Sequence, residues 1–271
     1  MKRTISMLLV LLATANLCGS PVVAGDTDGM VAIPGGPFVM GTDNGLADER
    51  PAHRITVPPF MIDRVAVSNR AFATFLNARG WKDTQNRRFY DVDDGDARIH
   101  RRGGRFVADP GYATHAAVEA SWRGARAYCR WHGKRLPTEA EWERAARGID
   151  GRTYPWGEMA PDASRARYAA GWNATVPVTG PEAGATPDGI LGLAGNTHEW
   201  TSSLYRPYPY RADDGREDPD AAGERVTRGG AHDGLAVHLR AAWRGDGVSR
   251  RPAAGHHNIG FRCARAAPPP R

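Results

Sequence analysis

The apolar residues of this chain rarely form long periodic runs, and this feature argues against both helical bundles and arrays of strand–helix–strand units. Glycine and proline, at 32 and 20 residues, are plentiful and interrupt regular elements with turns. A chain of 271 residues is still long enough to bury a substantial core. Because no internal repeat or interdomain linker is visible, the sequence predicts a single irregular, loop-rich α+β domain.

Local patterns predict several short elements within this domain. Residues 30–41, MVAIPGGPFVMG, indicate two strands around a Pro-Gly-Gly turn, and alternation over 55–67 indicates further strand that two prolines interrupt. Capping residues and apolar faces predict helices over 68–79 and 121–132, and a third behind the capping-box sequence TEAE. Residues 81–120 are polar and predict irregular structure.

The first residues have the pattern of an export signal. A positively charged start precedes a mostly apolar stretch that is too short to span a bilayer, and small residues up to Ala24 offer a cleavage point. We expect residues 1–24 to be a signal peptide, 25–265 to form the domain, and 266–271 to be a disordered tail. The mature protein is then periplasmic or secreted, without membrane insertion.

The positive charges do not form a nucleic-acid-binding pattern. The formal net charge is +6, but Lys and Arg are scattered along the chain apart from the pair Arg101-Arg102. The sequence contains no basic helix with interleaved aromatic residues. We therefore expect no nucleic-acid partner and interpret the charges as a solvated mixed surface.

Cysteine usage fits an exported protein. After signal cleavage only Cys129 and Cys263 remain, and an even count in an exported chain predicts one disulfide. That bond would close a loop of more than a hundred residues, and chain-entropy arguments assign to it a stabilisation of roughly 4 kcal/mol.

Four groups of motifs follow one another along the chain. They are MVAIPGGPFVMG with ERPAHRITVPPFMIDRVAVSNRAF, then SWRGARAYCRWHGKRLPTEAEWERAARG with YPWG, then GLAGNTHEW, and last RVTRGGA with NIGFRCAR. In this order, over about residues 30–265, they resemble the formylglycine-generating-enzyme family, also called the sulfatase-modifying-factor family. The resemblance implies an irregular α+β fold related to C-type lectins, and it matches Cys129 and Cys263 to a structural disulfide of that family.

The resemblance does not extend to the copper site of that family. Its enzymes oxidise a cysteine of a sulfatase peptide to formylglycine with O2 and a copper(I) ion held by two thiolates, the soft ligands that Cu(I) prefers. Those cysteines lie four and nine residues after a Gly-Gly turn, at the positions that Gly234 and Leu239 occupy here. We therefore expect neither copper held by two cysteines nor formylglycine generation.

The resemblance also implies a calcium site near GLAGNTHEW. Glu199 matches a carboxylate ligand, and the carbonyls of Gly195 and Thr197 match two more. A further acidic or amide ligand is replaced by Gly192, which weakens the binding of a hard cation. Calcium is therefore one hypothesis, and the alternative is that Asn196 and Glu199 satisfy buried loop amides.

Histidines gather in the segments that form the family's pocket. His198, His232 and His238, together with Asp233, are able to ligate Cu, Fe or Zn, to act as an acid–base relay, or only to line the pocket. These three interpretations remain open from the sequence, and the identity of any metal other than calcium is not predicted.

Aromatic residues complete the predicted small-molecule pocket. Trp243 and Tyr205 lie in neighbouring segments and are expected to form part of its wall. By contrast, His256 and His257 are interpreted as exposed loop residues.

Two functional classes fit these residues. The first is an exported oxidase or related enzyme that acts on a small molecule or peptide, similar to the periplasmic PvdO-type proteins, which oxidise a siderophore chromophore. The second is a noncatalytic ligand- or protein-binding module on the same lectin-like fold. Loss of the copper cysteines is consistent with both classes.

Overall fold

The computed structural model describes residues 29–245 and 251–268. The predicted signal peptide and the end of the predicted disordered tail lie outside these described residues. The start of that tail is ordered, contrary to the prediction, because Ala266 ends a β-strand and the Ala267 amide donates to the Pro59 carbonyl at 3.2 Å. Within the described ranges, no helix combines the length and the apolar character needed to cross a bilayer.

One three-stranded sheet joins the two ends of the domain. Its central strand β4 (Phe60–Asp63) pairs antiparallel with β1 (Met30–Ile33) and with β10 (Ala264–Ala266). The hairpin of β2 (Gly36–Met40) and β3 (His53–Val57) lies between β1 and β4 in the chain. These strands confirm the strand predictions made around the Pro-Gly-Gly turn and the alternating residues.

The three predicted helices are present. Each begins after a Ser or Thr whose hydroxyl accepts a backbone amide of the first turn. Before the third helix the capping box is complete, because Thr138 Oγ1 accepts the Glu141 amide at 3.0 Å and the Glu141 carboxylate accepts the Thr138 amide at 2.9 Å. The helices are α1 (Asn69–Arg79), α2 (Trp122–Trp131) and α3 (Glu139–Arg147), and short 3-10 turns are η1 (Ala47–Glu49), η2 (Glu182–Gly184) and η3 (Ala236–Leu239).

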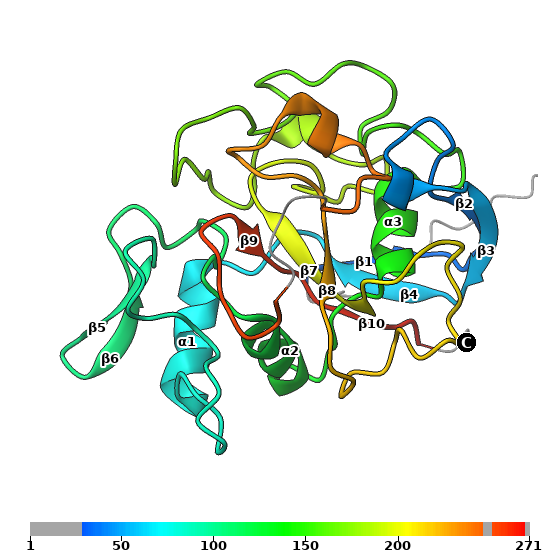
Figure 1. Cartoon of the computed structure of the whole chain (residues 1–271). Coiled ribbons are helices and arrows are strands. Elements are labelled where there is room, and N and C mark those ends of the chain that lie inside the picture. Colours follow the sequence, from blue (N-terminus) through cyan, green and yellow to red (C-terminus); the bar gives the residue numbers. More distant parts are fainter. Residues whose placement is uncertain (1–28, 246–250, 269–271) are drawn as a thin grey trace, which may run out of the picture.

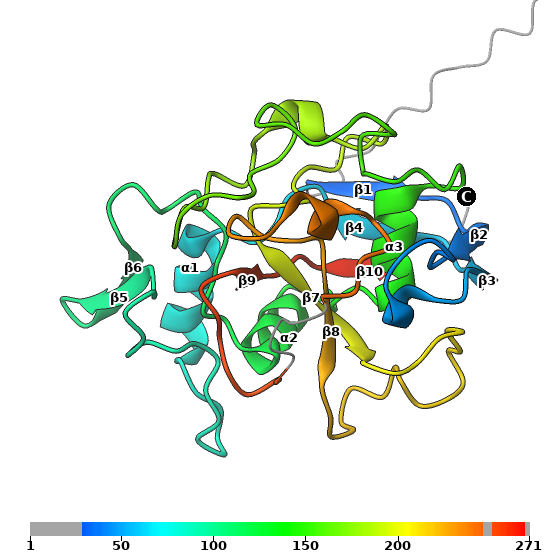
Figure 2. The same ribbon diagram turned by 45° about the horizontal axis from the view of Figure 1, so that its top comes forward.

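A second three-stranded sheet occupies the middle of the molecule. Its central strand β7 (His198–Leu204) pairs antiparallel with β8 (Arg225–Arg228) and parallel with β9 (Ile259–Gly260). Figures 1 and 2 show α1 and α2 on one side of this sheet and α3 with β2 and β3 on the other. The sheet therefore connects three segments that are far apart in the sequence.

The prediction of irregular structure over 81–120 is wrong in one place. A hairpin of β5 (Ile99–Arg102) and β6 (Arg105–Ala108) lies there, joined by Gly103 and Gly104, whose φ angles are 57° and 80°. Such a two-residue glycine loop is a hairpin signal. The charged residues on the exposed strands obscured the alternation that marks a half-buried strand.

Two apolar clusters and one disulfide hold these elements together. The first cluster surrounds Phe72 and Tyr128 between α1 and α2, and the second surrounds Trp142 of α3 and includes residues of β2, β3 and β4. The predicted disulfide joins Cys129 of α2 to Cys263, directly before β10, and both cysteines are fully buried. The irregular loops are thus anchored to a covalently closed core.

Candidate functional site

The Gly-Gly turn after β8 packs against the segment that precedes β7. The Gly195 amide donates to the Gly229 carbonyl at 2.7 Å, and the His232 amide donates to the Asn196 carbonyl at 3.0 Å. Gly229 has a φ of 97°, and a Cβ atom there would lie 3.0 Å from the carbonyl oxygen of Leu193. Glycine is therefore required at this close approach, which places the two histidine-bearing segments side by side.

Two further segments complete the site. The amides of Ala169 and Ala170 donate to the carbonyls of Gly234 and His232 at 2.8 and 2.7 Å, so the long loop between α3 and β7 is attached to the turn after β8. Figures 1 and 2 show that loop and η3 on the same side of the molecule. The parallel pairing of β9 with β7 adds residues 256–258 from near the end of the chain.

A stack of aromatic rings forms one part of the site. The imidazoles of His198 and His238 both stack on Trp243, with ring centroids 5.2 and 4.7 Å apart. His198 and Trp243 are buried, whereas His238 is half-buried. The Leu235 amide donates to Nδ1 of His238 at 3.3 Å and orients its ring. Three of the predicted pocket residues therefore lie together, with His238 as the member that reaches solvent.

The other part of the site is a group of two histidines and a carboxylate. His257 Nε2 lies 2.9 Å from Oδ2 of Asp233, and the Asn258 side-chain amide donates to both Asp233 oxygens at 3.3 and 3.2 Å. The ring of His232 lies edge-on to that of His257, with centroids 5.9 Å apart. Nδ1 of His232 lies 2.8 Å from the Asn196 carbonyl.

Burial and hydrogen bonding set the protonation states of these groups. Burial lowers the pKa of His198 to about 3 and also lowers the pKa of His232. The hydrogen bond from His257, and to a smaller extent that from Asn258, lowers the pKa of Asp233. At neutral pH the site therefore contains two neutral imidazoles near an ionised carboxylate.

Replacing His198 by phenylalanine is expected to make the protein less sensitive to acid. An unfolded histidine binds a proton below about pH 6.5, whereas folded His198 resists protonation down to about pH 3. The unfolded state therefore binds more protons in that window, and stability falls as pH falls, by about 1.4 kcal/mol per pH unit. Urea unfolding at pH 7, 6, 5 and 4 should give a steeper loss for the wild type than for the variant, and parallel curves would contradict the prediction.

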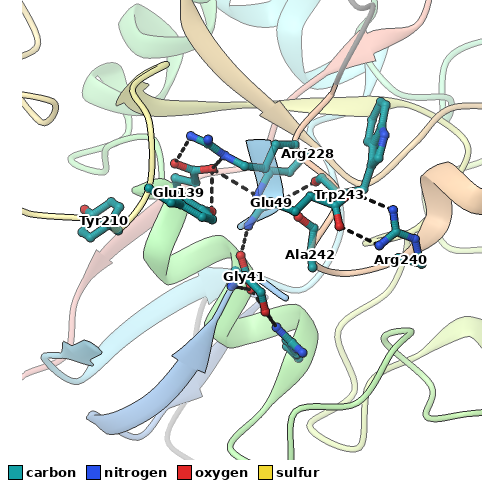
Figure 3. Close-up of polar contacts among 12 residues, drawn as sticks. Gly41, Glu49, Glu139, Tyr210, Arg228, Arg240, Ala242 and Trp243 are labelled. Carbon is teal, nitrogen blue, oxygen red and sulfur yellow. Dashed lines mark hydrogen bonds and ion pairs between the residues drawn. The ribbon is translucent and has the colours of Figure 1, made fainter. Parts of the chain in front are cut away.

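Buried charges hold the backbone beneath the ring stack. The Arg228 guanidinium donates to the carbonyls of Ala242 and Trp243 at 2.8 and 2.7 Å, as Figure 3 shows. Arg240 forms a two-pronged ion pair with the buried Glu49, with both contacts at 2.6 Å (Figure 3). The segment that carries Trp243 is therefore fixed on both sides by guanidinium groups.

Comparison with known proteins shows the family to which this chain belongs. The family model of the sulfatase-modifying factor enzyme 1-like domain matches residues 18–267. The chain belongs to this family. The formylglycine-generating enzyme of Streptomyces coelicolor is 36% identical over 289 residues, which cover 89% of this chain and 90% of that protein. The inactive C-alpha-formylglycine-generating enzyme 2 of Bos taurus is 33% identical over 294 residues, which cover 90% of each chain.

Other relatives place the same sulfatase-modifying-factor fold in different proteins. The structure of PvdO from Pseudomonas aeruginosa superposes with a TM-score of 0.62 and 26% identity, covering 88% of this chain and 94% of that one. The serine/threonine-protein kinase Pkn1 of Chlamydia trachomatis is 39% identical over 245 residues. This chain spans only 38% of the length of that kinase, so the likeness concerns one part of it. The predicted family and the loop-rich α+β fold are thereby confirmed.

The positions of the family's copper cysteines carry no ligand in this sulfatase-modifying-factor chain. Gly234 is half-buried and has no side chain. Leu239 is fully buried and packs in an apolar cluster with Ala166 and Ala194. An isobutyl group thus occupies the position that the resemblance assigns to the second thiolate, and His232, Asp233 and His238 lie in the same loop.

The structure does not support the calcium prediction at Glu199. Both carboxylate oxygens of this buried residue accept from the Arg262 guanidinium, each at 2.7 Å, and Oε2 also accepts from the Trp142 indole at 2.8 Å. A calcium ion bound through Glu199 would have to displace the Arg262 guanidinium from a fully buried ion pair. The neighbouring carbonyls of Gly195 and Thr197 therefore lie beside a carboxylate whose charge is already compensated.

Tyr205 contacts a different part of the molecule from the ring stack. Its hydroxyl donates to Oδ2 of Asp48 at 2.8 Å, and the Arg244 guanidinium lies 4.7 Å from the centre of its ring. These contacts belong to the buried charges around Glu139, to which Arg244 donates. The structure thus brings Trp243 together with His198 and His238, and it places Tyr205 among the buried charges instead.

Sequence reasoning missed His257 and Trp172 as members of the site. His257 is half-buried rather than exposed, because the exposed Trp172 stacks on its ring at 3.6 Å and Asp233 contacts its Nε2. The relevant signal is the parallel pairing of His198 with Ile259, which brings residues 256–258 beside β7. No local pattern reveals such a pairing, because it joins segments about sixty residues apart.

Proposed function

We propose that this protein is an exported oxidase-class enzyme that acts on a small aromatic molecule or an aromatic group of a peptide. The observation that carries the proposal is the histidine–tryptophan site in the loop where the family otherwise holds copper. The half-buried His238 and the hydrogen-bonded His257–Asp233 pair are the groups of this site that a substrate is able to reach from solvent for proton exchange. The site therefore retains a reactive character without the thiolates.

Exposed apolar side chains favour an aromatic substrate. Trp172, Leu235 and Val237 are 65%, 62% and 47% exposed, and all three belong to the segments that build the site. Large exposed apolar residues in neighbouring segments are typical of a ligand-binding surface. Trp172 stacks on His257, and the Leu235 amide contacts His238, so this apolar surface adjoins the imidazoles.

The proposed reaction is a two-electron dehydrogenation. The substrate loses two electrons and two protons, and O2 accepts the two electrons and the two protons to give hydrogen peroxide. His238 is half-buried and stacks on Trp243, where it is positioned to exchange one of these protons with a bound substrate. His257 and Asp233 form a hydrogen-bonded pair through which a proton is able to leave toward solvent, because both are half-buried.

Oxygen uptake tests this function directly. We expect the purified full chain to consume O2 when it is given catechol-type or other siderophore-like aromatic precursors. His238→Ala should reduce the rate by about 100-fold, because a group placed against the substrate for proton transfer typically contributes that much. His100→Ala is the matched control, since His100 lies on the β5–β6 hairpin and pairs with Asp109. Equal rates for wild type and His238→Ala would contradict the proposal.

A noncatalytic binding module is the second candidate. It is favoured by the apolar filling at Leu239 and by the 33% identity to a relative that is named as inactive. In that case the same aromatic compounds would bind with a Trp243 fluorescence change but would not be consumed, and no hydrogen peroxide would form.

A further inference from the structure

We propose that His232, Asp233 and His257 bind one divalent first-row transition-metal ion. Each residue offers a ligand atom, and these atoms all lie within 4.8 Å of one another. Two imidazoles and one carboxylate are the ligand set of mononuclear non-haem iron(II) oxygenases, and they also suit zinc, cobalt and manganese. The set uses neither of the positions that hold the family's copper cysteines, and it adds His257 from the segment before β9.

His232 is the most constrained of the three ligands. Its side chain is 0% exposed, and its Nδ1 lies 2.8 Å from the carbonyl oxygen of Asn196. A carbonyl only accepts, so Nδ1 carries the proton and Nε2 presents a lone pair. That Nε2 is buried and has no hydrogen-bond partner within residues 29–245 and 251–268. An imidazole fixed by a backbone carbonyl, with its other nitrogen free, is the usual arrangement of a metal-ligating histidine.

Asp233 and His257 are close enough to converge on the same ion. In the structure they share a hydrogen bond of 2.9 Å between His257 Nε2 and Asp233 Oδ2. Binding of a cation would replace this bond, because both atoms would then turn their lone pairs to the metal and the neutral His257 ring would carry its proton on Nδ1. The Asn258 amide remains available to orient the carboxylate.

The surroundings of His257 support an open but restricted site. Trp172 stacks on the imidazole at a centroid distance of 3.6 Å, and its indole donates to the Asp96 carboxylate at 3.0 Å. The stack limits rotation of the His257 ring. Because Asp233 and His257 are half-buried, an ion and small ligands are able to reach the site from solvent. Three protein ligands leave coordination positions for water or O2.

A neighbouring group of carboxylates differs from this site in its ligand atoms and therefore in the metal ions that it favours. Asp94, Asp96 and Glu119 also bring carboxylates within 4.8 Å of one another. This group contains no imidazole, and Asp96 already accepts from the indole of Trp172. Oxygen ligands alone favour magnesium or calcium over cobalt or zinc, so the choice of metal distinguishes the two groups.

The proposed metal site rests on the contacts described above. Only the use of the bound metal for O2 chemistry rests on the proposed function. We would titrate Co(II), whose visible absorption reports nitrogen coordination, into the exported full chain purified without a histidine tag. One Co(II) per chain is expected. Asp233→Asn, which keeps the shape of the side chain, and His257→Ala should each weaken binding by about 100-fold or more, since loss of even an outer contact typically costs 10- to 100-fold.

His256→Ala is the matched control, because His256 adjoins His257 in the chain and is outside the ligand set. It should bind Co(II) like the wild type. Binding that survives Asp233→Asn and His257→Ala in variants with wild-type thermal unfolding would overturn the site, and so would the absence of binding to the wild type. Binding that requires these residues, without O2 uptake after loading with Fe(II), would leave the metal site standing and refute the oxidase.

Discussion

Replacing Cys129 and Cys263 together by alanine is expected to lower the free energy of unfolding by about 4–5 kcal/mol. The disulfide links positions 134 residues apart, so it removes much conformational freedom from the unfolded chain. It also ties α2 to the residue before β10, inside the larger apolar cluster. Urea unfolding of the full chain with its disulfide formed and of the double variant measures the difference.

Reduction of the wild type separates the contribution of the cross-link to stability from that of the buried sulfur atoms. Wild type unfolded in the presence of dithiothreitol lacks the cross-link but keeps both sulfur atoms in the core. If the entropy of the cross-link dominates, the reduced wild type and the double variant should unfold at nearly the same urea concentration. A double variant as stable as the oxidised wild type would show that the bond contributes nothing.

Replacing Glu139 by glutamine is expected to destabilise the protein by about 3–5 kcal/mol, the usual cost of breaking a buried ion pair. The Glu139 carboxylate is fully buried and accepts from Arg244 at 2.6 and 3.1 Å and from the Tyr208 hydroxyl at 3.1 Å. Arg228 Nε lies 3.8 Å away. Glutamine removes the carboxylate that pairs with Arg244 and lies near Arg228, whereas Arg228 keeps its ion pair with Glu143.

The matched control for this variant is Glu182→Gln, since Glu182 is exposed in η2. It should change stability by less than about 0.5 kcal/mol. Equal unfolding midpoints for the Glu139 and Glu182 variants would refute the assigned role of the buried carboxylate.

The loss of stability in Glu139→Gln is expected to depend on pH. Burial opposes ionisation of Glu139, but Arg244 and Arg228 outweigh it and lower the pKa of the carboxyl. A lowered folded pKa contributes stability above the unfolded value, and this stability is lost as pH falls through the folded pKa. The difference between wild type and Glu139→Gln should therefore be largest at neutral pH and shrink in acid.

The local elements of this fold were largely predictable from the sequence. The capping residues before α1, α2 and α3 predict those helices because their hydroxyls satisfy amides of the first turn wherever the helix lies. The β5–β6 hairpin was missed because its strands are charged and mostly exposed. The motifs, by their order and spacing, predicted the family and the disulfide, neither of which depends on detailed packing.

The candidate site was predictable only in part. His198, His232, His238 and Asp233 all belong to the motifs of the pocket, and the structure brings them to one region together with Trp243. The separation of the ring stack from the group of His232, Asp233 and His257 was not visible, because it depends on ring orientation.

The sequence by itself determined the family, the capped helices and the paired cysteines, since each depends on residue types at fixed spacing. Only the tertiary structure decided that His257 joins Asp233 and that Glu199 is neutralised by Arg262. Both outcomes depend on β9 lying parallel to β7, which brings the end of the chain beside the central strand. Contacts between such distant segments follow from the packing of the whole core, so no local spacing encodes them.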